Sequence, residues 1–385
     1  MQKSDWKKCK LGDALNFHRG YDLPKDQMTG QGYPVVGSNG IIGYHDEYTT
    51  SAPCLVIGRS GNTGKPAIYN YPCWAHNTTL YVDDFKGNSP QFLCYLLKTM
   101  DLGSYAAGSA VPTLNRNHIH PLEINLPPLE EQKRIAQILG ALDDKIELLQ
   151  KQNKTLEDMA KAIFKSWFVN FDVVHAKQKG LPKADIMREY HLTDELYDLF
   201  PSDFENSSLG PIPLGWQVKN IQDVAKISSG KRPKSVKTQK TINHNIAVYG
   251  GNGIKWWTNE PLYTIPIIIT GRVGTLGQVY RIYEPIWVSD NALIFETNLD
   301  NFEYLFYMLK KVDFSSFNRG STQPLITQSD IKNIQFVYEG KFIKEFHNIV
   351  VQYENKILLN KKQIQTLTEL RDTLLPPLIS GKLRV

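Results

Sequence analysis

The chain has 385 residues, of which 41% are hydrophobic and 22% are charged, and its formal net charge is +5. This length predicts two or more domains, each able to bury its own core. The sequence has no apolar run long enough to cross a bilayer, so we expect no membrane segment. It shows no export signal, and its four cysteines have no metal-binding spacing, so we expect reduced thiols in a cytoplasmic protein.

The charge is unevenly distributed along the chain. Residues 129–205 carry 11 basic and 15 acidic side chains, whereas residues 206–340 carry 14 basic and 10 acidic ones. Residues 341–385 carry 8 basic and 4 acidic side chains. A basic excess in the second half favours a polyanionic partner without identifying it.

Residues 1–128 are predicted to form a first globular domain. Short apolar segments such as residues 54–57 lie between turns rich in Gly, Asn and Pro, a pattern typical of short β-strands. A short helix is expected over residues 90–100. We therefore expect a mixed α/β (α+β) globule with irregular strands.

Residues 129–172 are predicted to form one long helix. Pro127 and Pro128 stand before a first turn with two acids, which suits a helix start. Hydrophobic residues then recur every seven positions, the pattern of a coiled-coil seam, at Ile135, Leu142, Leu149, Leu156 and Ile163. The flanking positions hold Ile138, Leu139, Ile146, Met159, Ala160 and Trp167.

An acidic and polar connector, residues 173–205, follows the first long helix, and we expect a helix within residues 183–200. Residues 209–216 contain two prolines and lead into a second globular domain, residues 206–340. Its apolar segments, such as residues 266–270, again lie between turn residues.

The last predicted element is a second long helix within residues 341–385. Its seven-residue series is Phe346, Tyr353, Asn360, Leu367 and Leu374. We expect the two long helices to pair antiparallel as a coiled coil. The alternative is a pair of ordinary amphipathic core helices.

The two long helices are also related by sequence. Asp144-Lys145-Ile146 is matched by Asn355-Lys356-Ile357, 211 positions later (356 − 145). Polar residues in a seam often fix register, and we assign that role to Lys145, Gln152, Lys356 and Gln363.

The second globular domain repeats the first at an almost constant offset. The turn that begins Gly58-Arg59 returns as Gly271-Arg272, 213 positions later (272 − 59), and the sequence around Asn39 returns around Asn252 at the same offset. We match Asn77 with Asn291. A near-constant offset above 200 residues indicates a duplicated domain rather than a solenoid, so we expect a pseudo-two-fold internal repeat.

The sequence contains no catalytic or metal-binding constellation that spacing can identify. The turn over residues 58–64 is not a phosphate-binding loop, because Arg59 and Pro66 stand where that motif needs Gly and Ser or Thr. His118 and His120 have no counterpart in the second domain. We therefore expect no active site, no metal and no cofactor bound by this chain.

Candidate DNA contacts lie in equivalent turns of the two domains. An Arg follows the first Gly of the Gly-rich turn in both copies, which suits contact with a phosphate or a guanine. One alternative is that the turn is only a tight structural turn. Another is that each Arg forms an ion pair inside its own domain. Residues 226–240 carry six basic side chains and no acid, and form either a solvated loop or a loop that follows phosphates.

Aromatic residues after the hairpin turns, namely Tyr44, Trp256 and Trp257, are either core residues or contacts to bases and sugars. The predicted DNA-binding residues are Arg19, Asn39, Arg59, Asn62, Lys65, Asn77, Arg116, Lys231, Arg232, Lys234, Lys237, Asn252, Arg272, Gln278, Asn291 and Arg319.

Four stretches of this sequence are characteristic of one family. They are residues 126–136 (LPPLEEQKRIA), 164–172 (FKSWFVNFD), 209–216 (LGPIPLGW) and 374–382 (LLPPLISGK). With them the chain resembles, over nearly its whole length, the specificity subunit (HsdS) of type I restriction-modification systems. One departure is that the second long helix lacks the PPLEEQ entry of the first.

The resemblance implies two target-recognition domains, each of which reads one half of a split site in double-stranded DNA. It implies that the long helices pair antiparallel, set the distance between the halves and dock two modification subunits. Those subunits carry S-adenosylmethionine and the methyl transfer, and restriction subunits complete the assembly. The alternatives are a self-sufficient methyltransferase or nuclease with degenerate motifs, and a coiled-coil scaffold without a DNA role.

Overall fold

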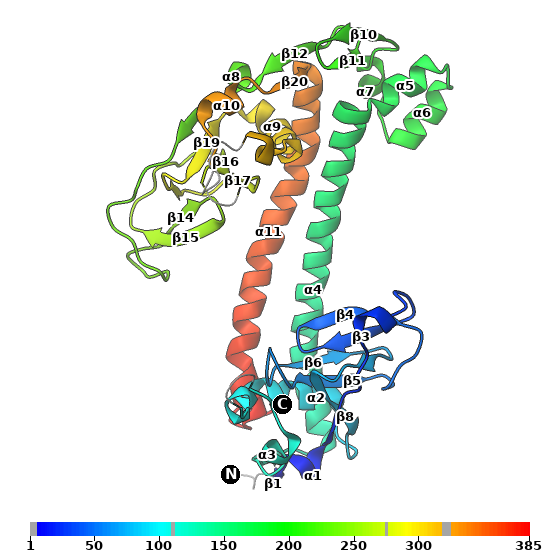
Figure 1. The fold of residues 1–385 in the computed structure, drawn as a ribbon, viewed down its shortest axis with the longest axis vertical. Coiled ribbons are helices and arrows are strands. Elements are labelled where there is room, and N and C mark those ends of the chain that lie inside the picture. Colours follow the sequence, from blue (N-terminus) through cyan, green and yellow to red (C-terminus); the bar gives the residue numbers. More distant parts are fainter. Residues whose placement is uncertain (1–5, 109–111, 274–275, 318–324) are drawn as a thin grey trace. The chain divides into compact units, whose positions relative to one another are not determined.

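The computed structural model describes residues 6–108, 112–273, 276–317 and 325–385. The chain divides into two compact units, Met1–Lys151 with Asn360–Val385, and Gln152–Leu359. Each unit contains one mixed α/β domain and one segment of each long helix (Figure 1). The mixed fold predicted from the sequence is thus confirmed.

The domain of the first unit has three small sheets among its described residues. A four-stranded antiparallel sheet has the order β2 (Asn16–Arg19), β8 (Thr79–Asp84), β5 (Cys54–Gly58) and β6 (Pro66–Tyr69). A second sheet has the order β4 (Gly40–His45), β3 (Tyr33–Gly37) and β7 (Trp74–Ala75), and a third pairs β1 (Lys7–Lys10) with β9 (Glu123–Leu126). The helical segments are α1 (Leu11–Ala14), η1 (Lys25–Gln27), α2 (Pro90–Thr99), η2 (Leu102–Tyr105) and α3 (Arg116–Ile119).

The core of this domain forms where strand β5 meets helix α2. All five residues of β5 are buried, as a continuous apolar run between turns predicts for a central strand. Helix α2 begins with Pro90 in its first turn and with Ser89 as N-cap, whose side chain accepts a hydrogen bond from the backbone N–H of Phe92. Its apolar residues join strand β5 in one buried cluster.

The second domain repeats this architecture strand for strand. Its four-stranded sheet has the order β13 (Lys226–Ser229), β19 (Ala292–Glu296), β16 (Ile267–Gly271) and β17 (Val279–Ile282). The other sheets are β15 (Gly253–Thr258), β14 (Ile246–Gly250) and β18 (Trp287–Val288), and the pair β12 (Gln217–Asn220) and β20 (Gln335–Tyr338). The helical segments are α8 (Ile221–Val224), α9 (Leu299–Lys311), η4 (Phe314–Phe317) and α10 (Gln328–Lys332).

Backbone pairing confirms the internal repeat. Gly58 pairs with Thr79 in the first domain, and Gly271 pairs with Ala292 in the second. Both members of the second pair lie 213 positions after their counterparts (271 − 58 and 292 − 79). The duplication predicted from sequence landmarks therefore extends to the register of the strands.

The two long helices are close to their predicted extents. Helix α4 (Leu129–Lys165) starts after Pro128, whose carbonyl accepts hydrogen bonds from the N–H groups of Glu131 and Gln132. It passes into a π-helical turn, η3 (Ser166–Asn170), and ends at Phe171, which has a left-handed backbone. Helix α11 (Gly340–Ile379) contains Pro376 and Pro377 in its last turn.

Within each unit, the helix segments pack in opposite directions. In the first unit, Ile135 near the start of α4 shares a core cluster with Leu378 near the end of α11, and Asp143 pairs with Arg371 at 2.8 Å. In the second unit, Phe164 near the end of α4 lies 5.9 Å from Phe346 near the start of α11, measured between ring centroids. Each unit by itself therefore shows the predicted antiparallel pairing.

The seam differs in detail from the predicted one. Ile135, Leu149 and Phe346 are buried, but the other apolar members of the two predicted series are only half-buried: Leu142, Leu156, Ile163, Tyr353, Leu367 and Leu374. The alternate positions of the 3-4 pattern are buried as well: Leu139, Ile146, Ala160, Trp167, Val350, Ile357 and Leu378.

Two further expectations about the long helices need correction. Ile138 and Met159 do not flank the seam but are 38% and 43% exposed. The polar residues assigned to the seam, Lys145, Gln152, Lys356 and Gln363, are all exposed. Each of these four residues lies one position before Ile146, Asn153, Ile357 or Ile364, of which the first three are buried. The buried polar residues of the helices include Asn153, Glu354 and Asn360, and Asn360 belongs to the predicted series.

The connector is more structured than its composition indicated. It forms α5 (Asp172–Gln178), α6 (Lys183–Tyr190) and α7 (Asp194–Leu199), so the helix expected within residues 183–200 is two helices. A hairpin of β10 (Phe204–Ser207) and β11 (Gly210–Pro213) follows. Val173, Ile186 and Phe200 are buried in the core of the second unit, so the connector is part of that core.

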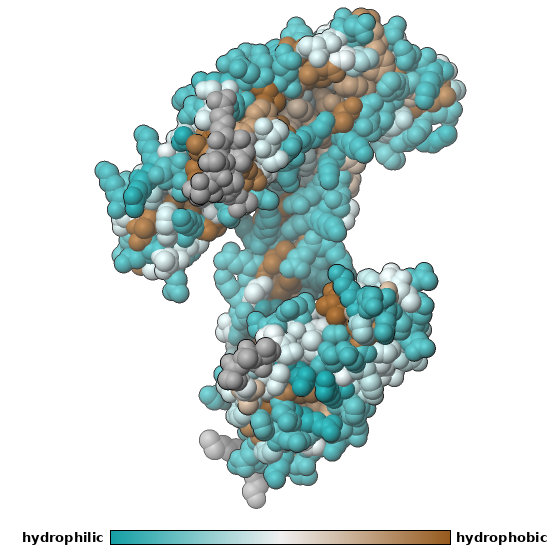
Figure 2. Space-filling view, viewed as in Figure 1, coloured by the Kyte–Doolittle hydropathy of each residue, from teal (hydrophilic) through white to brown (hydrophobic). Residues whose placement is uncertain are grey.

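None of the helices in the described part of the chain combines the length and the apolar character that a membrane crossing requires. Figure 2 shows a mainly hydrophilic surface on the face in view, where hydrophobic residues form separate patches.

Candidate nucleic-acid interface

The Gly-Arg turn follows a buried central strand in both domains. In the first domain, the backbone N–H of Arg59 donates to the Thr78 carbonyl at 2.8 Å, and its carbonyl accepts from the N–H of Leu114 at 2.8 Å. In the second, the N–H of Arg272 donates to the Asn291 carbonyl at 2.9 Å, and its carbonyl accepts from Ile326 at 3.0 Å. The two arginines therefore have the same backbone position.

Neither arginine forms an ion pair among the residues that the structure describes. The Nη1 atom of Arg59 donates to the backbone carbonyl of Asn77 at 3.3 Å. Burial, and then the nearby positive charge of Arg19, lower the pKa of Arg59. The Nε atom of Arg272 is buried and has no hydrogen-bond partner in the described part of the chain. The alternative that each arginine forms an ion pair inside its domain is thus not observed.

A close approach of two strands places Arg19 near this turn. Strand β2 ends at Arg19, and at Gly20 an added Cβ atom would lie 2.1 Å from the carbonyl oxygen of His76. At the equivalent Gly230, it would lie 2.2 Å from the carbonyl oxygen of Ser289. Only glycine permits this approach, which brings an exposed cation beside Arg59.

Three backbone segments of the first domain meet around Arg59. The N–H of Ser38, in the β3–β4 turn, donates to Thr78 Oγ1 at 3.2 Å. An added Cβ atom on Gly61 would lie 3.3 Å from Ser38 Oγ. The hairpin turn with the exposed Asn39, the Gly-rich turn and the β7–β8 turn therefore form one surface.

The second domain has a hollow at the corresponding place. It has a volume of about 450 Å³, and among its lining residues are Asn252, Lys255, Val273 and Asn291. The predicted residues Asn252 and Asn291 thus come together. Lys255 was missed by the sequence reasoning, although its position two residues after the repeated Gly253 could have indicated it.

The basic side chains of residues 226–240 are exposed. Among the described residues, Lys226 lies 3.4 Å from Glu296 and the other five form no ion pair. This segment is held by its backbone: Lys237 and Trp257 exchange N–H···O bonds of 2.8 Å, and the Trp287 indole donates to the Lys231 carbonyl at 2.6 Å. The side chains of Lys231, Arg232, Lys234 and Lys237 remain free to meet an anion.

Trp256 and Trp257 are half-buried, and each has a lysine over its ring. Lys255 lies 4.3 Å from the ring centroid of Trp256, and Lys240 lies 5.3 Å from that of Trp257. Tyr44 in the first domain is 44% exposed. None of the three is therefore a fully buried core residue.

Other predicted residues have different surroundings. Asn77 donates through Nδ2 to Asp22 Oδ1 at 2.5 Å, Asn62 is half-buried, and Lys65 and Gln278 are exposed. Arg116 donates to the backbone carbonyl of Phe17 at 2.9 Å, which directs its guanidinium inward. Arg319 lies outside the residues that the structure describes.

The repeat also corrects one pairing made from the sequence. The backbone bonds of the two arginines show that Asn291 corresponds to Thr78, and hence that Asn77 corresponds to Asp290. Trp74 corresponds to Trp287 in the same register, so position 77 corresponds to position 290 and not to 291. Asn77 and Asn291 are therefore not equivalent contacts.

The described residues contain no group of three metal-ligating side chains. His120 accepts a hydrogen bond from the backbone N–H of Phe17 at 3.1 Å and stacks on the Phe17 ring, so it has a structural role. Both domains have a surface with arginine, lysine and asparagine side chains beside hairpin turns. These side chains can bind phosphates and base edges.

Two related α/β domains joined by paired long helices define a class of DNA-recognition protein. The model of the type I restriction modification DNA specificity domain matches this chain twice, at residues 3–158 and 213–369. The chain belongs to this family, whose members recognise DNA and leave catalysis to other subunits.

Relatives and a solved structure agree with this assignment. The chain is 28% identical to the specificity subunit of the type I restriction enzyme MjaIX from Methanocaldococcus jannaschii, over 77% of this chain and 69% of that protein. It is 27% identical to the HindI specificity subunit of Haemophilus influenzae, over 76% and 77%. The crystal structure of a type I S subunit from M. genitalium has the same fold, with a TM-score of 0.67 at 18% identity, over 98% of this chain and 97% of that one.

Proposed function

We propose that this chain gives a type I restriction-modification complex its DNA specificity, with each domain reading one part of a two-part site in duplex DNA. The proposed organisation is a first recognition domain at residues 1–128, a second at 206–340, and helices at 129–172 and 341–385 that set the spacing. Two modification subunits dock on the helices and carry S-adenosylmethionine. Restriction subunits complete the assembly, which acts in the cytoplasm.

The duplication carries this proposal. The two domains have the same strand order and register, and each presents an arginine without an acidic partner among the described residues on the same turn. Two equivalent reading surfaces in one chain suit a site of two parts. Half-sites read on one face of B-DNA lie about 34–36 Å apart or a multiple of this, a distance that stiff helices hold better than a flexible linker.

The test is sequencing of methylated sites in cells that carry the complete system. We expect a single motif of two short defined sequences with a fixed gap. Purified chain, with S-adenosylmethionine and Mg²⁺ but no other subunit, should neither methylate nor cleave DNA. Methylation by the chain alone would favour the self-sufficient enzyme, and absence of DNA binding by the complex would favour the scaffold.

A further inference from the structure

The two domains differ at the place where each meets its long helix. In the second domain, the guanidinium of Arg281 on β17 is 10% exposed and lies 2.7 Å from Glu303 on α9. It also pairs with Glu354 on α11 and lies over the Phe306 ring, 4.3 Å from its centroid. One arginine thus fills the junction between sheet, short helix and long helix.

The repeat identifies the corresponding positions of the first domain. Strand pairing matches Arg281 with Ile68, since Ile268 pairs with Arg281 as Leu55 pairs with Ile68. The ends of α2 and α9 match Tyr307 with Tyr95. At the offset of this helix, Glu303 and Phe306 correspond to Gln91 and Cys94 (303 − 91 = 306 − 94 = 212). At the offset of the long helices, Glu354 corresponds to Asp143 (354 − 143 = 211).

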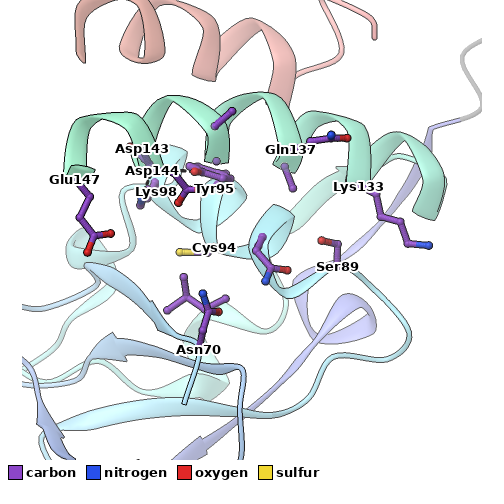
Figure 3. Close-up of a pocket in the computed structure, with 15 residues that line it drawn as sticks. Asn70, Ser89, Cys94, Tyr95, Lys98, Lys133, Gln137, Asp143, Asp144 and Glu147 are labelled. Atoms are coloured by element: carbon purple, nitrogen blue, oxygen red, sulfur yellow. Dashed lines mark hydrogen bonds and ion pairs between the residues drawn. The ribbon is translucent and has the colours of Figure 1, made fainter. Parts of the chain in front are cut away.

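The first domain therefore keeps the tyrosine and the helix carboxylate but lacks the arginine. A groove of about 660 Å³ is found there, and all five equivalent residues line it: Ile68, Gln91, Cys94, Tyr95 and Asp143 (Figure 3). All of them belong to the first unit. The groove thus lies at the positions that surround Arg281 in the second domain.

The carboxylate in this groove is held in place by other groups. Tyr95 donates its hydroxyl to Asp143 at 2.7 Å, and Arg371 of α11 donates to it at 2.8 Å. Lys98 lies 3.8 Å away. In the second unit, the position equivalent to Arg371 is the buried Ala160 (371 − 211), so the cation there comes from the sheet instead.

Two lysines and three acids line the groove, and both lysines already face an acid: Lys98 faces Asp143, and Lys133 pairs with Glu130. Figure 3 shows Asp144 and Glu147 on α4 beside Asp143. Asp144 has no ion pair among the described residues, and Glu147 pairs with the exposed Lys151. At Gly140, an added Cβ atom would meet no described atom within 4 Å, so the α4 side of the groove has room for another side chain.

We propose that this groove binds an arginine side chain of a partner protein, in the place that Arg281 takes in the second domain. A guanidinium is planar and has five N–H donors, so it can bond Asp143 and Gln91 while it lies against Tyr95. Asp144 and Glu147 at the edge favour a cation over a phosphate, because the two lysines of the lining already face acids. Because Arg371 already balances Asp143, the free chain remains folded while the groove is open.

The first test uses a small probe and two variants that close the groove differently. Ile68→Arg with Gln91→Glu reproduces the ion pair of the second domain, and Gly140→Leu fills the groove from α4. The wild-type chain should bind N-acetyl-arginine amide saturably, at least tenfold better than the uncharged N-acetyl-citrulline amide. Both variants should lose this binding with melting temperatures near that of the wild type. Equal binding of citrulline, or binding retained by a folded variant, would overturn the proposal.

The second test uses the co-expressed modification subunit, and this step rests on the proposed function. The complex recovered by size-exclusion chromatography should fall at least tenfold for both variants, while the affinity of the free chain for duplex DNA stays unchanged. Unchanged assembly of both variants would overturn the assignment of this partner. If the proposed function itself is wrong, the wild-type chain does not bind duplex DNA. This result is distinct from unchanged assembly of the two variants.

Discussion

Single residues decide what the repeated turns can bind. Arg59 and Arg272 have equivalent backbone bonds, and neither has an ion pair among the described residues. A half-buried cation that has no ion pair with its own domain remains available to attract an anion. Arg116, in contrast, is directed to the Phe17 carbonyl and supports the domain itself.

We expect Arg59→Ala and Arg272→Ala each to weaken binding of cognate duplex DNA by the assembled complex. Loss of a base contact costs about 1–3 kcal/mol and relaxes one position of one half-site. Loss of a phosphate contact weakens binding to all sequences and lowers the salt slope by about one. Fluorescence anisotropy as a function of salt measures both.

Arg116→Ala is the matched control for these two variants. It should lower the melting temperature, because the Phe17 carbonyl loses its donor, and leave the DNA affinity of the folded complex unchanged. A result in which Arg59→Ala or Arg272→Ala lowers only the melting temperature would show that these arginines are structural.

The charge of Asp143 is predicted to stabilise the folded chain. Burial acts to raise the pKa of Asp143, but hydrogen bonds from Arg371 and Tyr95 outweigh it, and the pKa lies below its usual value. A lowered pKa gives stability that is present above the unfolded value of about 3.9 and is lost as the pH falls through the folded value.

We therefore expect Asp143→Asn to melt at a lower temperature than the wild type at pH 7, with a difference that shrinks as the pH falls below about 4. Thermal melts between neutral and acidic pH measure this. Asp144→Asn, at an exposed neighbour without an ion pair among the described residues, should follow the wild-type profile. A constant difference between Asp143→Asn and the wild type would contradict the role of the charge.

At the scale of elements, the long helices bury a 3-4 pattern of side chains while their outer faces stay exposed. Leu149 is 2% exposed and the adjacent Leu148 is 48% exposed. The same chemical change at these two positions therefore separates the effect of packing from that of helix propensity.

We expect Leu149→Ala to destabilise the chain by about 2–5 kcal/mol, because it leaves a cavity in the seam. Leu148→Ala should change stability by less than about 0.5 kcal/mol. Denaturant unfolding of both variants measures the difference. Equal effects would mean that Leu149 is not in a packed contact.

The long helices are also predicted to set the distance between the two half-sites in DNA. Insertion of one seven-residue repeat into both α4 and α11 keeps the pattern of the seam and lengthens each helix by about 10 Å. Sequencing of methylated sites should then show a longer gap between unchanged half-sites. An unchanged gap would exclude the helices as the determinant of spacing.

At the scale of the whole molecule, each domain is a complete copy with its own sheets and core. Each of the two main core clusters takes its residues from one unit alone, so each domain should be exchangeable. Replacement of residues 206–340 by the matching segment of a family member should change one half of the methylated motif and leave the other as it was. A change in both halves would exclude independent reading.

The sequence by itself determined the features that depend on residue type at short spacing. The heptads predicted the long helices, the continuous apolar segments predicted the central strands, and the constant offset predicted the duplicated domain. Such patterns are visible in sequence because helices and strands have fixed periods and because a duplication keeps its landmarks in order. The Gly-Arg turns were found in the same way.

Only the tertiary structure decided which of these residues meet. Asp143 and Arg371 are 228 positions apart, and no local pattern relates them. Arg116 is of a residue type that suits DNA contact, but it points inward. The seam of α4 also includes Leu139, Ile146 and Ala160, four positions after members of the predicted apolar series. The equivalent carboxylates Asp143 and Glu354 pair with cations from different elements, Arg371 of α11 and Arg281 of β17. The direction in which a side chain packs depends on the neighbours that the fold brings together.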